Sequence, residues 1–319
     1  MYFHKSEIDL CYVKGHNTTF MVKSVKTTGK KRAKKSSSRV AKVKIKKPFS
    51  NYQKAIEYLF GRTDYEKQER LRYNVTTFNL KRMHNLLSLL GDPHLKIHTV
   101  HIGGTKGKGS TATMLAKMLE ANGYKVGLYT SPHLVHLHER IMVNSEMISE
   151  SQMRDLLNRI YAPVEKLSKT DPPTFFEIMT AMAFMYFVDT AVDIAIIETG
   201  MGGRLDSTNV IQPKVVGITS LSIDHSQQLG NTIDRIAEEK AGIIKQGVPA
   251  VTVLQEPAAM QVLKSRALAM NAPLSITGAD IDFSHRFETS REDGPHTRIC
   301  MTTPTIKFEH LRLPLHGKH

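Results

Sequence analysis

The chain of 319 residues is long enough to bury a sizeable core, and its 40% hydrophobic and 23% charged residues are typical of a globular protein. Its formal net charge of +14 first suggests a nucleic-acid-binding protein, but residues 21–47 alone hold twelve Lys and Arg and no Asp or Glu. Subtracting those twelve charges from +14 leaves +2 for the rest of the chain, which excludes a strongly basic folded body.

Cysteine content and hydropathy argue against a disulfide framework and a membrane helix. The chain has two cysteines, Cys11 and Cys300, which is too few for a disulfide-stabilised secreted protein of this length. No apolar run approaches the roughly 20 residues that a membrane helix needs. The N-terminal "MYFHKSEIDLCYV" is interrupted by charge from its fifth residue, unlike a signal peptide. We therefore expect a cytoplasmic protein.

Residues 1–47 differ from the rest of the chain in composition. They are rich in Lys, Ser and Thr and poor in apolar residues, so they cannot bury enough surface to offset the entropy of ordering, and we expect them to be disordered. Two interpretations are open: a solvated tail (or a misplaced start codon), or a tail that contacts RNA, DNA or anionic lipid. Residues 48–319 are expected to form the folded domain.

Beyond residue 51 the apolar pattern predicts helices, then strands and helices in alternation. "YQKAIEYLFG" and "FNLKRMHNLLSLLG" have helical spacing, and each ends in glycine, Gly61 and Gly91. Strands are predicted at 96–102, 125–129, 193–197, 215–221 and 250–254. Helices are predicted at 109–122, 149–168, 174–188, 231–245 and 256–270. Because the strands are apolar on both faces, the pattern predicts an α/β doubly wound, mainly parallel sheet with helices on both faces. After Asn271 we expect shorter antiparallel strands.

The stretch "HIGGTKGKGS" at residues 101–110 joins the first of these strands to a helix. It departs from the commonest phosphate-loop pattern, because Ile102 stands where that pattern has glycine and Gly109 separates Lys108 from Ser110. Successive backbone N–H groups, a helix N-terminus and a lysine nevertheless favour phosphate binding over a mere tight turn. Ser110 is expected either to cap the helix or to face a magnesium ion.

Polar clusters also follow the other strands, and carboxyl ends of parallel strands form the ligand-binding edge of such a sheet. Glu198 ends a buried strand, which suits a magnesium ligand, although an exposed loop acid is the alternative. His225 follows the fourth strand and by itself is equally consistent with an ordinary loop histidine. The histidines of "HLVHLHE" match no tetrahedral zinc pattern, so we interpret them as surface residues. Lys240 either pairs with its helix neighbours or carries a carbamate near the metal edge.

Taken together, these clusters resemble the folylpolyglutamate synthase/dihydrofolate synthase branch of the Mur ligase family, whose central domain has a P-loop NTPase-like fold. The resemblance covers about residues 51–254 and rests on the runs "GGTKGKGST", "GYKVGLYTSPHL", "HERIMVN", "PTFFEIMTAMAF", "DIAIIETGMGGRLDSTN" and "DHSQQLGNTIDRIAEEKAGIIKQGVP". The Mur-type loop places glycine between lysine and hydroxyl, as this chain does. The chain departs from the family where it has Lys106 in place of the usual Asn.

The resemblance implies roles for individual residues. ATP phosphates would contact the loop Thr105, Lys106, Gly107, Lys108, Gly109 and Ser110, with Lys108 on the transferred group. Ser131 and Glu198 would bind one magnesium ion and His225 a second, with Lys240 as a carbamylated lysine that supports this second metal. Folate or pteroate would contact Thr174, Phe175, Phe176, Glu177, Leu205, Asp206 and Ser207. Of these, Phe175 and Phe176 are credible platforms for a flat ring.

The reaction that the resemblance implies is ATP-driven amide formation. The carboxylate of folate or dihydropteroate attacks the γ-phosphorus to give an acyl phosphate, from which the amine of L-glutamate displaces phosphate. In relatives, a similar G-x-H is followed by a separate C-terminal domain. The sequence ends at "LPLHGKH", before such a domain. We therefore expect weak nucleotide or folate binding and little or no ligase turnover from residues 1–319, and, as for relatives, a monomer.

Other functions stay open at this point. One is a non-catalytic remnant that binds ATP or folate. Another is a nucleic-acid-associated ATPase that uses the basic tail, which the nearly neutral body disfavours. A cell-wall Mur ligase is a third, and the runs "TSPHL" and "GMGGRLDSTN" favour the folate branch over it.

Overall fold

The computed structural model describes residues 48–64, 78, 80–169, 171–223, 232–291, 294–303 and 307–313. The predicted basic tail lies outside these ranges, and so does His225. In the described ranges, no helix is long and apolar enough to cross a membrane.

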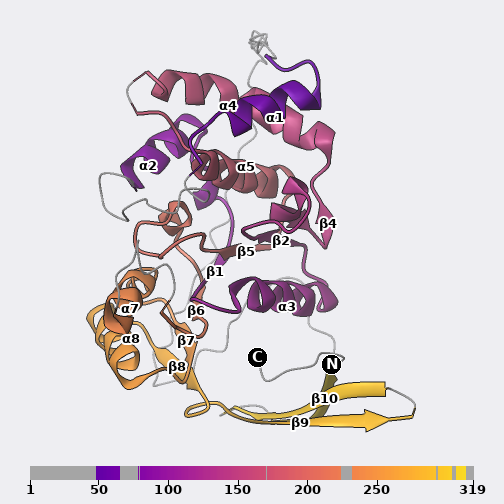
Figure 1. The fold of residues 1–319 in the computed structure, drawn as a ribbon, viewed down its shortest axis with the longest axis vertical. Coiled ribbons are helices and arrows are strands. Elements are labelled where there is room, and N and C mark those ends of the chain that lie inside the picture. The colour runs from indigo at the N-terminus through magenta and orange to yellow at the C-terminus, as the bar shows by residue number, and fades with distance from the viewer. Residues whose placement is uncertain are drawn as a thin grey trace, which may run out of the picture. The chain divides into compact units, whose positions relative to one another are not determined.

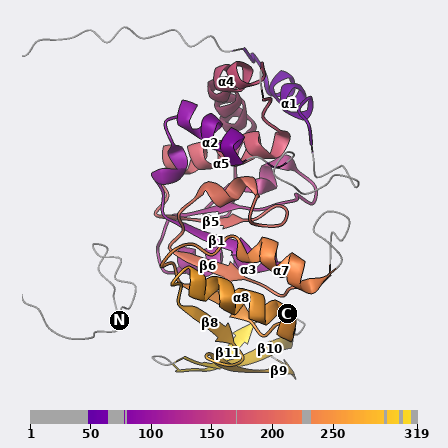
Figure 2. The same cartoon turned by 90° about the vertical axis from the view of Figure 1, so that its left-hand side faces the viewer.

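An eight-stranded sheet forms the centre of the described fold, in the order β4-β3-β2-β5-β1-β6-β7-β8 (Figures 1 and 2). Its six parallel strands are β1 (Thr99–Gly103), β2 (Val126–Tyr129), β5 (Ile194–Glu198), β6 (Val215–Ile218), β7 (Ala250–Val253) and β8 (Leu274–Thr277). Strands β3 (Ile141–Val143) and β4 (Glu146–Met147) add an antiparallel edge. The connection from β1 leads to β2 on one side of the sheet, and the connection from β5 leads to β6 on the other side. The direction of winding therefore changes between the neighbouring strands β1 and β5, which is where doubly wound folds place their ligands.

Helices cover both faces of this sheet (Figure 1). They are α1 (Tyr52–Phe60), α2 (Leu80–Leu89), α3 (Lys108–Ala121), α4 (Glu150–Leu167), α5 (Phe175–Asp189), α7 (Ile233–Ala241) and α8 (Pro257–Ala269). Short 3-10 helices are η2 (Pro93–Leu95), η3 (Leu137–Arg140) and η4 (Ser207–Val210). The alternation of β5 shows the two layers: Ile197 packs in the core with α5, whereas Ile196 packs with Ala112 and Ala116 of α3.

Local sequence explains where several helices begin and end. Asn51 caps α1 by accepting the Lys54 N–H at 3.0 Å, and Gly61 follows its last turn as predicted. Ser149 and Gln152 form a capping box at the start of α4. Gly91, after α2, has a φ of 77°, a conformation that favours glycine.

The predicted parallel α/β sheet is confirmed, with differences at its edges. The antiparallel strands expected after residue 271 are present as a sheet of β9 (Asp282–Ser290), β10 (Gly294–Thr302) and β11 (Lys307–Leu313). Strands β3 and β4 were not expected, and β8, which lies where antiparallel strands were expected, joins the parallel sheet instead. The predicted first strand begins three residues later, because 93–95 form a 3-10 helix, and α7 ends before Gly242, which is a poor helix former.

Candidate functional site

The glycine-rich segment joins the carboxyl end of β1 to the N-terminus of α3. Gly107 has a φ of 81°, and a Cβ there would have no described atom within 4 Å, so its backbone conformation alone calls for glycine. Position 104 calls for glycine for a different reason: a Cβ there would lie 1.9 Å from Thr219 Oγ1. Helix α3 starts at Lys108 and its cap residue is Gly107, so Ser110 is not the helix cap. The loop therefore presents a helix N-terminus, which attracts anions.

Neighbouring elements hold this loop in place. The Thr105 N–H donates to Ser220 O at 2.9 Å, and Thr105 Oγ1 donates to Ser222 O at 3.2 Å, so the segment after β6 anchors it. Lys240 of α7 is buried and its Nζ donates to Gly104 O at 2.7 Å. The alternative of a surface ion pair for Lys240 is therefore wrong. Its neighbour Glu239 makes the surface ion pair instead, with Arg204.

Glu198, at the tip of β5, lies beside the loop and beside Ser131. The Ser131 N–H donates to Glu198 Oε2 at 3.1 Å, and a Cβ on Gly109 would lie 3.4 Å from the same oxygen. Glu198 is 4% exposed, which excludes the alternative of an exposed loop acid. Burial raises the pKa of its carboxyl to about 7, against the lowering effects of the Ser131 N–H and the Lys108 ammonium.

This arrangement fits a hard cation such as Mg²⁺. The buried Ser131 Oγ has no hydrogen-bond partner among the described residues, and Glu198 offers carboxylate oxygens next to it. Within the described ranges, however, no three His, Cys, Asp or Glu side chains gather as a complete metal site. His225, which the resemblance implies as the ligand of a second magnesium ion, lies outside those ranges. His133, of the "HLVHLHE" run, instead accepts a hydrogen bond from Arg140 Nε at 2.9 Å.

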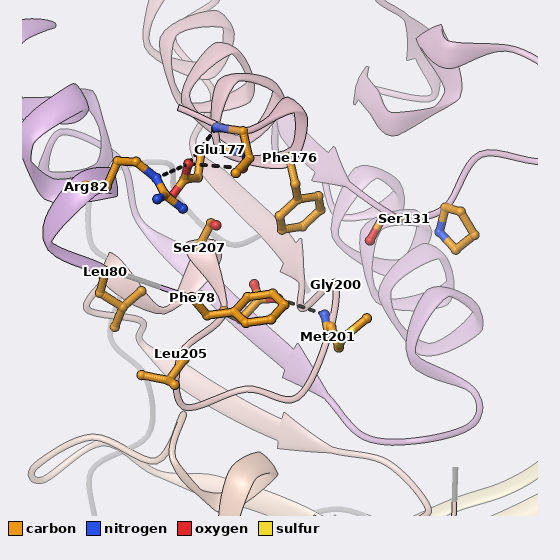
Figure 3. Close-up of a pocket in the computed structure, with 13 residues that line it drawn as sticks. Phe78, Leu80, Arg82, Ser131, Phe176, Glu177, Gly200, Met201, Leu205 and Ser207 are labelled. Atoms are coloured by element: carbon orange, nitrogen blue, oxygen red, sulfur yellow. Dashed lines mark hydrogen bonds and ion pairs between the residues drawn. The ribbon is translucent and has the colours of Figure 1, made fainter. Parts of the chain in front are cut away.

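A pocket of about 200 Å³ opens next to Ser131 (Figure 3). Its lining comprises Phe78, Leu80, Arg82, Ser131, Pro132, Thr174, Phe176, Glu177, Gly200, Met201, Leu205, Asp206 and Ser207. In the view of Figure 3, Ser131 lies on one side and Leu80 and Leu205 lie on the other. The pocket thus combines apolar and aromatic walls with a few buried charged groups, as small-molecule sites commonly do.

The start of α5 supplies one wall, but not all of its residues face the pocket. Phe176 lines the pocket, and its ring passes so close to Gly200 that a Cβ there would lie 2.6 Å from Phe176 Cζ. Phe175 is 1% exposed, belongs to the core and stacks on the exposed ring of Phe60, with ring centroids 5.8 Å apart. The expectation that both phenylalanines form ring platforms is therefore wrong for Phe175, because successive helix residues point in different directions.

Glu177 is held by protein groups on two sides. Its Oε2 accepts the N–H of Thr174 at 2.8 Å, which caps α5, and both of its oxygens accept from Arg82 Nε, at 2.9 and 2.7 Å. Arg82 also donates from Nη1 to Asp171 at 2.9 Å. Glu177 thus lines the pocket mainly as the partner of a buried arginine.

The segment after β5 supplies the opposite wall. Asp206 Oδ2 accepts the Met201 N–H at 2.8 Å, and Oδ1 accepts the Thr208 N–H at 2.9 Å, so this carboxylate ties the two ends of the segment together. Burial raises the pKa of Asp206, against the lowering effect of these hydrogen bonds. The neighbours Leu205 and Ser207 face the pocket as well.

The structure therefore gathers most of the predicted residues along one sheet edge. The loop, Ser131 and Glu198 are adjacent, and Ser131 also belongs to the pocket that holds Thr174, Phe176 and the segment 205–207. Sequence reasoning missed Arg82, Phe78, Leu80 and Met201. For Arg82 there was a signal: a charged residue on the apolar face of the predicted helix is rarely buried unless it is paired.

Comparisons with known proteins show the family to which the chain belongs. Residues 102–319 match the Mur ligase middle domain. The chain is 42% identical over 275 residues to the dihydrofolate synthase/folylpolyglutamate synthase of Bacillus subtilis, covering 85% of this chain and 61% of that protein. It is 43% identical over 183 residues to human mitochondrial folylpolyglutamate synthase, covering 56% of this chain and 31% of that protein.

Solved structures give the same result. The folylpolyglutamate synthase of Thermotoga maritima superposes with a TM-score of 0.74 at 36% identity, covering 84% of this chain and 58% of that one. An FPGS-AMPPCP-folate complex has a TM-score of 0.75 at 34% identity, with 84% and 63% covered. The chain thus spans less than two thirds of the length of these relatives. Its sequence and its fold together show that it belongs to the Mur ligase family, with folylpolyglutamate and dihydrofolate synthases among its relatives.

Proposed function

We propose that the chain provides the ATP-binding and pteroate-binding site of a ligase that joins L-glutamate to the carboxylate of folate or dihydropteroate through an acyl phosphate. The observation that carries the proposal is the position of Ser131. Its N–H contacts Glu198, which lies against the glycine loop, and its side chain borders the pocket. A nucleotide phosphate and a carboxylate held in the pocket would thus meet beside Ser131.

In this proposal the glycine loop binds the triphosphate. The N-terminus of α3 offers backbone N–H groups, and the Lys108 side chain, whose Nζ is 3.5 Å from Thr105 O, lies over the loop to neutralise charge on the transferred phosphoryl group. Lys106, at the exposed edge of the loop, would add a second positive charge. Positioning and charge neutralisation supply most of the catalysis in phosphoryl transfer, so no nucleophilic side chain is needed.

Magnesium would be held by Ser131 Oγ and the Glu198 carboxylate, and a second ion by His225. When bound, Mg²⁺ would neutralise charge on the phosphates. We propose Lys240 as a residue that fixes the loop through Gly104 O, and its carbamate form stays a prediction that intact-protein mass spectrometry can test.

The pocket would hold the flat ring system of folate or dihydropteroate. The Phe176 ring offers an aromatic face and Leu205 an apolar wall, and Asp206 holds the backbone of the segment that forms this wall. The resemblance to an FPGS-AMPPCP-folate complex supports both ligands together.

Binding measurements on the chain test this proposal. By calorimetry we expect AMPPCP with Mg²⁺ to bind, and dihydropteroate or tetrahydrofolate to bind separately. Lys108→Met should weaken only the nucleotide, and Phe176→Ala only the pteroate ligand. Glutamate-dependent ADP release, measured in parallel with each substrate on this chain and on a version extended through any downstream coding sequence, reports which of them is extended. Absence of binding of both ligands, or loss of both in each variant, would refute the assignment of separate nucleotide and pteroate sites.

A further inference from the structure

His101 is a buried histidine in the middle of β1, two residues before the glycine loop begins. It has no exposed surface, and its Nε2 lies 2.8 Å from the hydroxyl of Thr208 in η4. Its Nδ1 is buried without a hydrogen-bond partner in the described part of the chain. Burying an unsatisfied ring nitrogen costs free energy that an apolar side chain would avoid, so the histidine calls for an explanation other than packing.

Thr208 links this histidine to the pocket. Its Oγ1 donates to Asp206 Oδ1 at 2.5 Å, and its N–H donates to the same oxygen at 2.9 Å. The other oxygen of Asp206 accepts the Met201 N–H at 2.8 Å. Asp206 and Met201 both line the pocket. A continuous chain of hydrogen bonds therefore runs from His101 through Thr208 to Asp206 and Met201.

The direction of these hydrogen bonds fixes the form of the imidazole. The Thr208 hydroxyl has a single hydrogen, which it donates to Asp206, so toward His101 it can only accept. Nε2 of His101 must then carry a hydrogen. Burial and the nearby Lys245 ammonium lower the pKa of His101 to about 3, so the ring is neutral and its only hydrogen is on Nε2. Nδ1 then carries no hydrogen, which agrees with the absence of a hydrogen-bond partner for it among the described residues.

We propose that His101 is a positioning residue for the pteroate pocket: as the Nε2–H tautomer it orients the Thr208 hydroxyl toward Asp206 and so fixes the pocket wall formed by Asp206 and Met201. This inference rests on the proposed function. Because β1 also leads into the glycine loop, one strand sets the position of the phosphate-binding backbone and, through His101, the position of the pocket wall. The role is distinct from substrate contact, since His101 is fully buried.

Substitutions that remove single links test the proposal. His101→Leu removes the donor, Thr208→Val removes the hydroxyl, and His101→Gln keeps an N–H able to reach Thr208. Thr99→Val is the matched control, because Thr99 is a buried residue of the same strand outside the relay. For dihydropteroate we expect about tenfold weaker binding in His101→Leu and in Thr208→Val, about the same loss in the double variant, and partial recovery in His101→Gln.

AMPPCP with Mg²⁺ should bind all these variants within about twofold of the parent, because the relay ends in the pocket and not in the loop. Normal dihydropteroate affinity in His101→Leu, or losses that add up in the double variant, would overturn the proposal. A loss in His101→Gln as large as in His101→Leu would also overturn it, because an N–H donor at this position would then make no difference.

A second measurement needs no ligand and separates this inference from the proposed function. Hydrogen exchange of the Met201 and Thr208 amides, which both donate to Asp206, should become faster in His101→Leu and Thr208→Val but not in Thr99→Val. The ¹⁵N shifts of His101 should show a protonated Nε2 and a bare Nδ1. If the parent chain binds neither dihydropteroate nor tetrahydrofolate, the proposed function fails, while hydrogen exchange still decides on the relay. Unchanged exchange, or an Nδ1–H tautomer, would overturn it.

Discussion

Replacing Glu198 with Gln should stabilise the protein at high pH, even though Glu198 is a proposed magnesium ligand. Glu198 is 4% exposed and burial raises the pKa of its carboxyl from 4.5 to about 7. The folded protein therefore holds this carboxylate in its ionised form at a cost. Gln has nearly the same shape and carries no charge, so the variant removes the cost and leaves the packing in place.

The size and sign follow from the two pKa values. A difference between 4.5 and about 7, at about 1.4 kcal/mol for each pKa unit, corresponds to roughly 3 kcal/mol. Below pH 4.5 the carboxyl is protonated in both the folded and the unfolded chain, and the stabilisation from the raised pKa is fully present. As the pH rises through about 7 this stabilisation is lost, because the unfolded chain releases its proton first.

Urea denaturation of both proteins at pH 4.5 and pH 8 measures this difference. We expect the free energy of unfolding of Glu198→Gln, relative to the parent, to increase by about 3 kcal/mol between the two pH values. Glu146→Gln, at an exposed position of β4, controls for the loss of one negative charge. A relative stability that stays constant from pH 4.5 to pH 8, or that decreases, would refute the reasoning.

Three further changes test the geometry of the site. Gly107→Ala should strain the loop by about 1–2 kcal/mol and weaken AMPPCP binding about five- to thirtyfold. Gly123 has a similar φ at the far end of α3, so Gly123→Ala should leave the AMPPCP affinity unchanged. Equal effects of the two substitutions on AMPPCP binding would contradict the assignment of the loop as the phosphate site. Gly200→Ala should push the Phe176 ring from its place and abolish dihydropteroate binding, which calorimetry would detect, and retained affinity would argue against this pocket wall. Arg82→Met should lower the free energy of unfolding, measured in urea, by about 3–5 kcal/mol, because it leaves Glu177 buried without its partner. A loss below about 1 kcal/mol would contradict the burial of the Arg82–Glu177 ion pair.

The sequence predicted the sheet well because most residues of its strands are apolar on both faces, with few polar exceptions such as Thr99 and His101 of β1. Strand β1 is buried at all five positions and β5 at four of five, so both were recognisable without an amphipathic pattern. Strand β8 was missed because its residues, LSIT, are only partly buried and resemble a loop. The two-residue strand β4 depends on pairing with β3, a contact that no local pattern indicates.

The site was predicted in part, and helix α5 shows why the rest was not. Twelve of its fifteen residues are buried, so the sequence gives no polar face from which to decide which phenylalanine points to the pocket. Arg82 was missed because its partners, Asp171 and Glu177, are about 90 residues away in the sequence. The metal-binding role of His225 stays a prediction, as do the basic tail and the cytoplasmic location.

The burial of α5 on all sides also determines where this protein can adapt to a different ring system. A change in α5 large enough to reshape the pocket would disturb the packing of α1, α2 and α4 in the same core. Leu80, the first residue of α2, and Leu205 border the cavity at the margin of that core, and both are only partly buried. Efforts to redesign ligand preference should therefore begin with these two leucines, where volume can be exchanged at small cost to folding.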